Sequence, residues 1–165
     1  VNLELNSSYF TVSSTNVWPG TAAVFTSYAS TGSTYLWTFG DGNTATTAKA
    51  TNSYAAPGVY TVSLTVTGTA TYNRDVVVQV KPTVTFTAGP LVGTAPLSVT
   101  FTNTSVNTNY VTAWRWTVKS GTNISTNDPV FAYTYTTVGT NDIILRATTA
   151  AGNVTVTNKA YIKVQ

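Results

Sequence analysis

Cysteine and histidine are both absent from this sequence of 165 residues. Without cysteine the chain forms no disulfide, so its stability has to come from apolar packing and backbone hydrogen bonds. The two absences also remove the thiolate nucleophile, the usual general base and the common ligands of transition metals. We therefore expect that the protein is not an enzyme, because no motif marks the remaining options, a Ser–Lys pair or a pair of carboxylates.

Charge is scarce as well. Charged residues make up 8% of the chain, against about 25% in an ordinary globular protein. The net charge is +3, but the basic residues are scattered and form no run that could follow a phosphate backbone. Nucleic acid is therefore not an expected partner. Threonine, serine and asparagine replace the charges, a composition typical of extracellular β proteins, and we predict an extracellular, cell-surface or virion-surface location.

Long apolar runs are also missing. No stretch approaches the roughly 18–20 apolar residues that a helix needs to span a bilayer, so membrane insertion is not expected. No signal peptide is recognisable, and the chain begins at Val1. These two features indicate a processed product or an excised fragment.

Apolar and polar residues alternate through most of the chain, which predicts half-buried strands. In residues 59–66, every second side chain from Tyr60 onward is apolar. Farther on, Val76, Val78 and Val80 are expected to face inward in the same way. Gly, Pro, Asn and Asp interrupt these segments at short intervals, as the turns of an all-β sandwich require.

The chain also repeats itself, with loops of different length in the two copies. Four pairs of segments correspond: Trp37-Thr38-Phe39 with Trp116-Thr117-Val118, Phe25-Thr26-Ser27 with Phe101-Thr102-Asn103, Gly58 with Gly139, and Val78-Gln79-Val80 with Ile162-Lys163-Val164. We place the boundary between two domains, residues 1–81 and 82–165, at a proline that blocks continuation of the strand.

The first copy carries two motifs in order, which together contain Trp37, Phe39, Gly40, Asp41, Gly42, Tyr54, Pro57, Gly58 and Tyr60. This copy resembles the PKD (polycystic kidney disease) domain family, whose signature is a Trp-x-Phe-Gly-Asp-Gly stretch followed by a Tyr-x-x-Pro-Gly-x-Tyr turn. The second copy resembles the family less closely, because it keeps Trp116, Tyr135 and Gly139 but has lost the Gly-Asp-Gly turn and the proline. The resemblance implies an all-β fold of two tandem immunoglobulin-like, PKD-type β-sandwiches.

The tryptophans are the first candidates for function. Trp37 and Trp116 are expected in the core between two sheets, with a sugar-stacking platform as the alternative. Trp114 lies on the same side of its strand as Trp116 and is expected to face inward too. Trp18 precedes Pro19-Gly20 in a predicted loop, which makes it the better candidate for a ligand contact with carbohydrate.

The Gly40-Asp41-Gly42 segment is interpreted as a turn, in which the glycines allow positive φ and the Asp side chain binds backbone N–H groups. Asp41 is also a weak candidate for calcium ligation, although calcium prefers several carboxylates and the chain has only five. No other cofactor is expected. Four Asn-x-Ser/Thr sequons are candidate glycosylation sites, with unmodified surface asparagine as the alternative. They begin at Asn6, Asn103, Asn123 and Asn153.

These observations favour a non-catalytic structural or adhesion protein, a component of a surface coat, stalk, sheath or fibre. Its expected partners are other surface or coat proteins, including copies of itself, and carbohydrate. Two alternatives stay open: a carbohydrate- or polymer-binding accessory region of a secreted hydrolase, and a virion decoration or tail-fibre protein. The resemblance alone does not choose between them, because PKD modules occur in surface-layer proteins, adhesins, secreted hydrolases and receptors.

Overall fold

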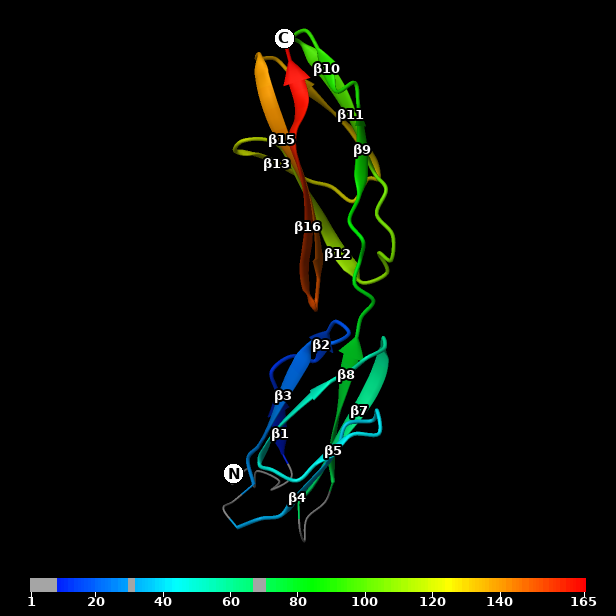
Figure 1. Ribbon diagram of the computed structural model, residues 1–165, viewed down its shortest axis with the longest axis vertical. Coiled ribbons are helices and arrows are strands. Elements are labelled where there is room, and N and C mark those ends of the chain that lie inside the picture. Colours follow the sequence, from blue (N-terminus) through cyan, green and yellow to red (C-terminus); the bar gives the residue numbers. More distant parts are fainter. Residues whose placement is uncertain (1–8, 30–31, 67–70) are drawn as a thin grey trace, which may run out of the picture. The chain divides into compact units, whose positions relative to one another are not determined.

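A computed structural model describes residues 9–29, 32–66 and 71–165 of the chain. Every regular element in these ranges is a β-strand, as the alternating pattern predicts (Figure 1). None of the described residues belongs to a helix long and apolar enough to cross a bilayer. The chain divides into two units, Val1–Val80 and Lys81–Gln165.

The first unit contains two facing sheets with the strand orders β1-β3-β6 and β2-β8-β7-β4-β5. Its strands are β1 (Phe10–Val12), β2 (Asn16–Val17), β3 (Ala22–Ser27), β4 (Tyr35–Thr38), β5 (Thr44–Ala45), β6 (Lys49–Ser53), β7 (Gly58–Val66) and β8 (Tyr72–Val78). All pairs are antiparallel except β2 with β8, which run parallel. The unit is therefore a β-sandwich in which a short early strand joins the last strand.

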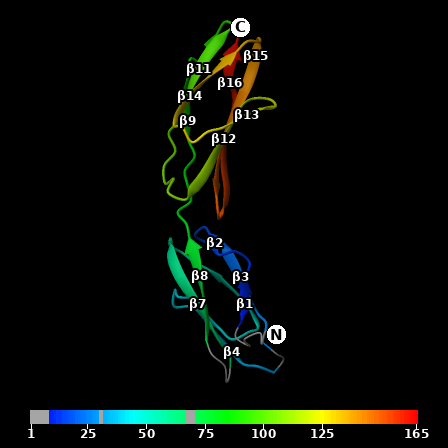
Figure 2. The same ribbon diagram turned by 180° about the vertical axis from the view of Figure 1, so that it is seen from behind.

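The second unit contains sheets with the orders β14-β11-β9 and β10-β16-β15-β12-β13, seen from both sides in Figures 1 and 2. Its strands are β9 (Phe86–Gly89), β10 (Val92–Gly93), β11 (Leu97–Asn103), β12 (Val111–Lys119), β13 (Thr122–Ser125), β14 (Val130–Tyr135), β15 (Gly139–Thr149) and β16 (Gly152–Val164). Here β10 and β16 form the parallel pair.

The two units have the same topology. Each strand from β1 to β8 has a counterpart eight elements later, and the order of neighbours in the two sheets is identical. The predicted tandem pair of immunoglobulin-like β-sandwiches is therefore confirmed.

The register corrects one part of the internal alignment. Gly58 pairs with Val78 in the first unit, whereas Gly139 pairs with Val164 in the second. Because the two glycines correspond, Val164 is the counterpart of Val78. The predicted match of Val164 with Val80 is wrong by two residues.

The prediction that Val80 faces the core is wrong for the same reason. The ladder between β7 and β8 ends at the pair Gly58–Val78, and the alternation of the strand ends with it. The side chain of Val80 is 38% exposed, whereas that of Gln79 is buried. Gln79 Nε2 donates a hydrogen bond of 2.8 Å to Asn16 Oδ1, and its backbone N–H donates one of 2.9 Å to the Val17 carbonyl.

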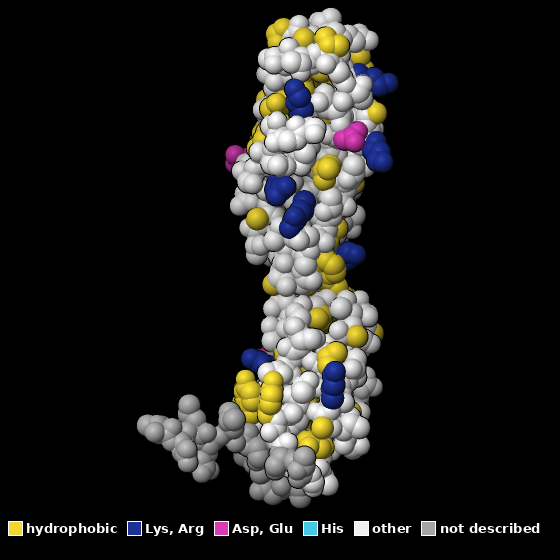
Figure 3. Space-filling view, turned by 90° about the vertical axis from the view of Figure 1, so that its left-hand side faces the viewer, with side chains coloured by type: hydrophobic (Ala, Val, Ile, Leu, Met, Phe, Trp, Pro, Cys, Tyr) yellow, Lys and Arg dark blue, Asp and Glu magenta, His cyan; other side chains and the backbone are white. Residues whose placement is uncertain are grey.

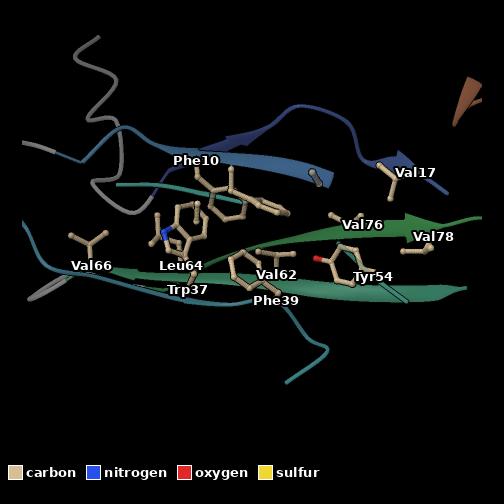
Figure 4. Packing of buried hydrophobic residues seen from close by; sticks show 13 residues of the cluster. Phe10, Val17, Trp37, Phe39, Tyr54, Val62, Leu64, Val66, Val76 and Val78 are labelled. Carbon is tan, nitrogen blue, oxygen red and sulfur yellow. The ribbon is translucent and has the colours of Figure 1, made fainter. Parts of the chain in front are cut away.

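Each unit has its own aromatic core. In the first, Trp37 is fully buried and packs edge-on against Phe10, with ring centroids 5.0 Å apart (Figure 4). In the second, Trp116 is fully buried and packs against Phe86 and Phe131, each with a centroid distance of 5.2 Å. Both tryptophans thus lie between the sheets, as predicted, and burying a large apolar side chain stabilises a fold by about 2–3 kcal/mol.

Candidate functional site

The Gly40-Asp41-Gly42 turn connects β4 to β5 in the first unit. Its glycines have φ angles of +80° and +94°, in the left-handed region that favours glycine. A Cβ atom on Gly40 would lie 2.9 Å from the carbonyl oxygen of Thr61 in β7. The turn therefore lies directly against the neighbouring strand and leaves no space between them at this point.

The carboxylate of Asp41 holds the turn together. It accepts hydrogen bonds from the backbone N–H and the Nδ2 of Asn43, both 3.0 Å long, and from Asn52 Nδ2 at 2.7 Å. Burial acts to raise the pKa of Asp41, but the hydrogen bonds from Asn52 and Asn43 together outweigh it and lower the pKa. The charged form of Asp41 is thus the one that the folded unit stabilises.

Calcium ligation by Asp41 stays a prediction. Both carboxylate oxygens of Asp41 accept hydrogen bonds from N–H groups. Among the described residues, no group of three or more His, Cys, Asp or Glu side chains comes together to hold a metal ion. A calcium ion prefers six to eight oxygen ligands.

The second motif of the first unit surrounds the start of β7. Tyr54 is fully buried and stacks on Tyr60 with a centroid distance of 4.3 Å, while the Tyr60 hydroxyl donates to the Ala56 carbonyl at 2.9 Å. The Tyr60 bond spans the exposed Pro57-Gly58 turn and fixes the entry into the strand. Burial raises the pKa of Tyr54 to about 12.

In the second unit both motifs have changed. Lys119-Ser120-Gly121 replaces the Gly-Asp-Gly turn and forms the tight hairpin between β12 and β13, with Gly121 at a φ of +79°. Tyr135 remains buried, and its hydroxyl donates a hydrogen bond of 2.7 Å to the Val118 carbonyl. Gly139 opens β15, as Gly58 opens β7.

A pocket of about 580 Å³ lies between these two changed motifs. Its lining comes from the β12–β13 hairpin, from the segment before β15 and from β15 itself: Thr117, Lys119, Ser120, Gly121, Thr137, Val138, Gly139, Thr140, Asn141, Asp142 and Ile144. Lys119 Nζ donates a hydrogen bond of 2.9 Å to Thr137 Oγ1 across it. Hydroxyl groups, one ammonium and one carboxylate make this pocket able to bind a polar ligand.

Beside the pocket, two arginines meet that the sequence does not bring together. Arg115 on β12 pairs directly with Arg146 on β15. Sequence reasoning described the basic residues as scattered and missed this pair, because only the strand register shows that residues 31 positions apart are opposite each other. The sequence did contain one signal for the pair. Arg115 is next to Trp116 and Arg146 is next to Leu145, so alternation along each strand predicts that both arginines point away from the core.

Trp18 and Trp114 lie in intermediate environments. Trp18 follows β2 in a loop, as predicted, and is half-buried. Its contact with carbohydrate stays a prediction. The turn after it folds back, because the Thr21 N–H donates to the Trp18 carbonyl at 3.0 Å and the Gly20 N–H to the Tyr54 carbonyl at 2.8 Å. Trp114 is half-buried and packs against the core of the second unit, on the inward side as predicted.

The sequons lie in different settings. Asn6 is outside the described residues. Asn103 ends β11, half-buried, and its Oδ1 accepts the Ser105 N–H at 3.1 Å. Asn123 and Asn153 are exposed on β13 and β16. Glycosylation of these four asparagines stays a prediction.

Solved structures support the fold. Fibronectin(III)-like modules of CbhA from Clostridium thermocellum match with a TM-score of 0.51 and 16% identity over 94% of this chain and 95% of that one. Murine CEACAM1b matches with a TM-score of 0.53 and 13% identity over 95% and 100%. At these identities the likeness shows a shared fold and nothing about activity.

Sequence comparison identifies the family. None of the curated proteins compared shows significant similarity to the chain. Models of the PKD domain, however, match residues 11–81 and residues 83–162. Because the two matches are consecutive and together cover most of the sequence, the chain belongs to the PKD domain family and contains a tandem pair of PKD domains.

Proposed function

We propose that the chain is a non-catalytic structural module of a surface coat, stalk, sheath or fibre, outside a cell or on a virion, and that it carries tension between its partners. Those partners are other surface or coat proteins, including copies of itself. The observation that carries this proposal is the parallel pairing of an early strand with the last strand in each unit.

In the first unit, backbone hydrogen bonds join the parallel strands β2 and β8. The Val77 N–H donates to the Thr15 carbonyl at 2.8 Å, and the Gln79 N–H donates to the Val17 carbonyl at 2.9 Å. Tension pulls β2 toward its amino end and β8 toward its carboxyl end. The parallel strands then slide past each other, so their hydrogen bonds are loaded together and not one after another.

The second unit repeats this arrangement. The Lys163 N–H donates to the Leu91 carbonyl at 2.8 Å, and the Gln165 N–H donates to the Gly93 carbonyl at 2.8 Å. Lys163 occupies the position of Val77 in the corrected register. The same mechanical element is therefore present twice, which supports a load-bearing role better than a single occurrence would.

The test is single-molecule force spectroscopy on the full chain, held by its two ends. Val77→Pro removes the N–H that binds Thr15, and Lys163→Pro does the same in the second unit. We expect each variant to lower the unfolding force of its own unit and to leave the other unit unchanged.

A core variant serves as the control. Val99→Ala removes buried apolar volume from the second unit and leaves its parallel pair intact. We expect it to lower the free energy of unfolding by about 2 kcal/mol with a smaller loss of force than Lys163→Pro. Proline variants that unfold at the force of the original chain would contradict the proposal.

A further inference from the structure

The outward face of β12 and β15 in the second unit carries an unusual pair of charges. Arg115 and Arg146 are directly opposite each other across two antiparallel strands. Like charges in this position destabilise a sheet, because their Cβ atoms lie only about 5 Å apart. Among the described residues, neither guanidinium forms an ion pair. The sheet thus maintains two adjacent cations without a carboxylate partner.

One of these guanidiniums is also incompletely satisfied. The Nε atom of Arg146 is buried and has no hydrogen-bond partner among the described residues. A buried donor without an acceptor costs about 1–3 kcal/mol. An anion bound between the two arginines would remove the repulsion between them.

The pocket described above is continuous with this pair. Thr117 and Ile144, which line the pocket, pair with each other at the next outward position along the same two strands. Lys119 lies one outward position farther and also lines the pocket. We call the surface formed by Arg115, Arg146 and the pocket the cationic face.

The charge of the cationic face is positive overall. Arg115, Arg146 and Lys119 contribute three cations, against the single carboxylate of Asp142. Asp142 Oδ1 already accepts the Ala160 N–H at 2.7 Å and so holds the bulge in β16. Figure 3 shows several Lys and Arg side chains on this side of the second unit, with few Asp or Glu side chains among them.

The described residues of the first unit form no such face, although the unit has the same topology. Leu36 and Thr65 pair at the positions of Arg115 and Arg146. At the position of the pocket, Gly40 lies directly against β7. The cationic face is therefore a feature of the second unit and not a consequence of the fold.

We propose that the cationic face binds an acidic polysaccharide, with carboxylate or sulfate groups on the two arginines and sugar hydroxyls in the pocket. Arginine suits such groups because its planar fork binds them with two parallel hydrogen bonds. Threonine and serine hydroxyls, Lys119 and Asp142 line the pocket and match the donors and acceptors of a sugar. This inference goes beyond the structural role proposed above and does not depend on it.

The geometry favours a polysaccharide over an acidic peptide. An extended peptide usually binds at a sheet edge, where backbone groups are free. Here the site lies on the face of β12 and β15, whose backbone groups are used in the ladders with their neighbours. A nucleic acid is disfavoured because no aromatic side chain lines the pocket on which a base could stack.

The experiment measures binding of polygalacturonate and of chondroitin sulfate to the full chain by calorimetry. The first probe presents uronate groups and the second presents sulfate esters as well, and binding of either supports the proposal. We expect affinity to fall steeply with salt. Amide resonances of residues 115–121 and 137–146 are expected to shift in NMR spectra.

The decisive variant is Arg115→Leu/Arg146→Thr, because Leu and Thr are the residues that the first unit has at these positions. We expect it to lose about tenfold or more in affinity. Lys49→Ala/Arg74→Ala removes the same charge from the first unit and is expected to bind as the original chain does.

Four results would overturn the proposal. The first is that neither polysaccharide binds, and the second is that the control variant loses as much affinity as the arginine variant. The third is that poly-L-glutamate binds as tightly as the polysaccharides, and the fourth is that single-stranded DNA binds as tightly as they do. The third result would assign the face to acidic peptides, and the fourth to phosphate backbones. Hydrogen exchange of both variants checks that the second unit remains folded.

Discussion

The two units place the same buried rings at the same positions, yet they satisfy the polar atoms of those rings in different ways. In the first unit, Trp37 Nε1 donates a hydrogen bond of 2.8 Å to the Thr47 carbonyl. In the second, Trp116 Nε1 is buried and has no partner among the described residues. Both tryptophans are completely buried all the same.

The tyrosines show the reverse. The Tyr135 hydroxyl of the second unit donates a hydrogen bond of 2.7 Å to the Val118 carbonyl, whereas the buried Tyr54 hydroxyl of the first unit lies beside the Asn52 side chain and forms no hydrogen bond of good geometry with a described residue. Of these two aromatic residues, each unit therefore leaves one without a hydrogen bond of good geometry for its polar atom. The comparison teaches that ring volume and position, not these hydrogen bonds, are what the shared fold requires.

The largest difference is expected in the turn that only the first unit has. Gly40→Ala would place a methyl group against the Thr61 carbonyl in a positive-φ conformation. We expect a loss of about 3 kcal/mol in the free energy of unfolding. Gly42→Ala is the matched control, since its Cβ would meet no atom within 4 Å, and should cost about 1 kcal/mol. Chemical denaturation, followed by hydrogen exchange in each unit, measures both, and equal losses would refute the close approach.

The second largest difference in the free energy of unfolding is expected between variants of the two buried tryptophans. Replacement by phenylalanine removes similar volume in both units, but only Trp37→Phe also leaves a carbonyl without its donor. We expect Trp37→Phe to cost about 1 kcal/mol more than Trp116→Phe. Hydrogen exchange of the full chain, measured separately for each unit, tests this. An equal or larger cost for Trp116→Phe would contradict the expectation that the hydrogen bond of Trp37 contributes to the stability of the first unit.

For the tyrosines the expected order of the units is reversed. Tyr135→Phe loses the bond to Val118 and should cost about 1 kcal/mol. Tyr54→Phe removes a buried hydroxyl that lies beside the Asn52 side chain but forms no hydrogen bond of good geometry with a described residue, so it should be neutral or slightly stabilising. Thermal unfolding of the two variants beside the original chain gives the answer, and destabilisation by Tyr54→Phe would show that its hydroxyl has a partner after all.

The smallest expected effect is on how the stability of the first unit depends on pH in acid. The pKa of Asp41 is lowered in the folded unit, below the value of about 3.9 in an unfolded chain. Its contribution to stability is therefore complete above pH 4 and is lost as the pH falls through the folded pKa. Asp41→Asn should flatten the acid dependence of the first unit between about pH 5 and 2, as hydrogen exchange or NMR can measure. An unchanged acid profile would mean that the turn does not depend on the charge.

The sequence by itself determined the class of the fold. Alternation in residues 59–66, the repeated tryptophans and the Gly-Asp-Gly motif are local signals, and strand formation and positive-φ turns are local consequences of them. That is why the tandem sandwiches and the buried positions of Trp37 and Trp116 could be predicted. The local pattern failed at Val80, because the end of a strand depends on where its partner ends.

Only the tertiary structure decided which distant residues meet. The pairing of Arg115 with Arg146, the bond between Lys119 and Thr137 and the half-burial of Trp18 all depend on strand register or on the packing of a loop. Register is set by contacts between strands, and a shift of one residue would turn every side chain to the opposite face. The cationic face therefore exists only in the folded chain, because the sheet, and not the sequence, places its charges side by side.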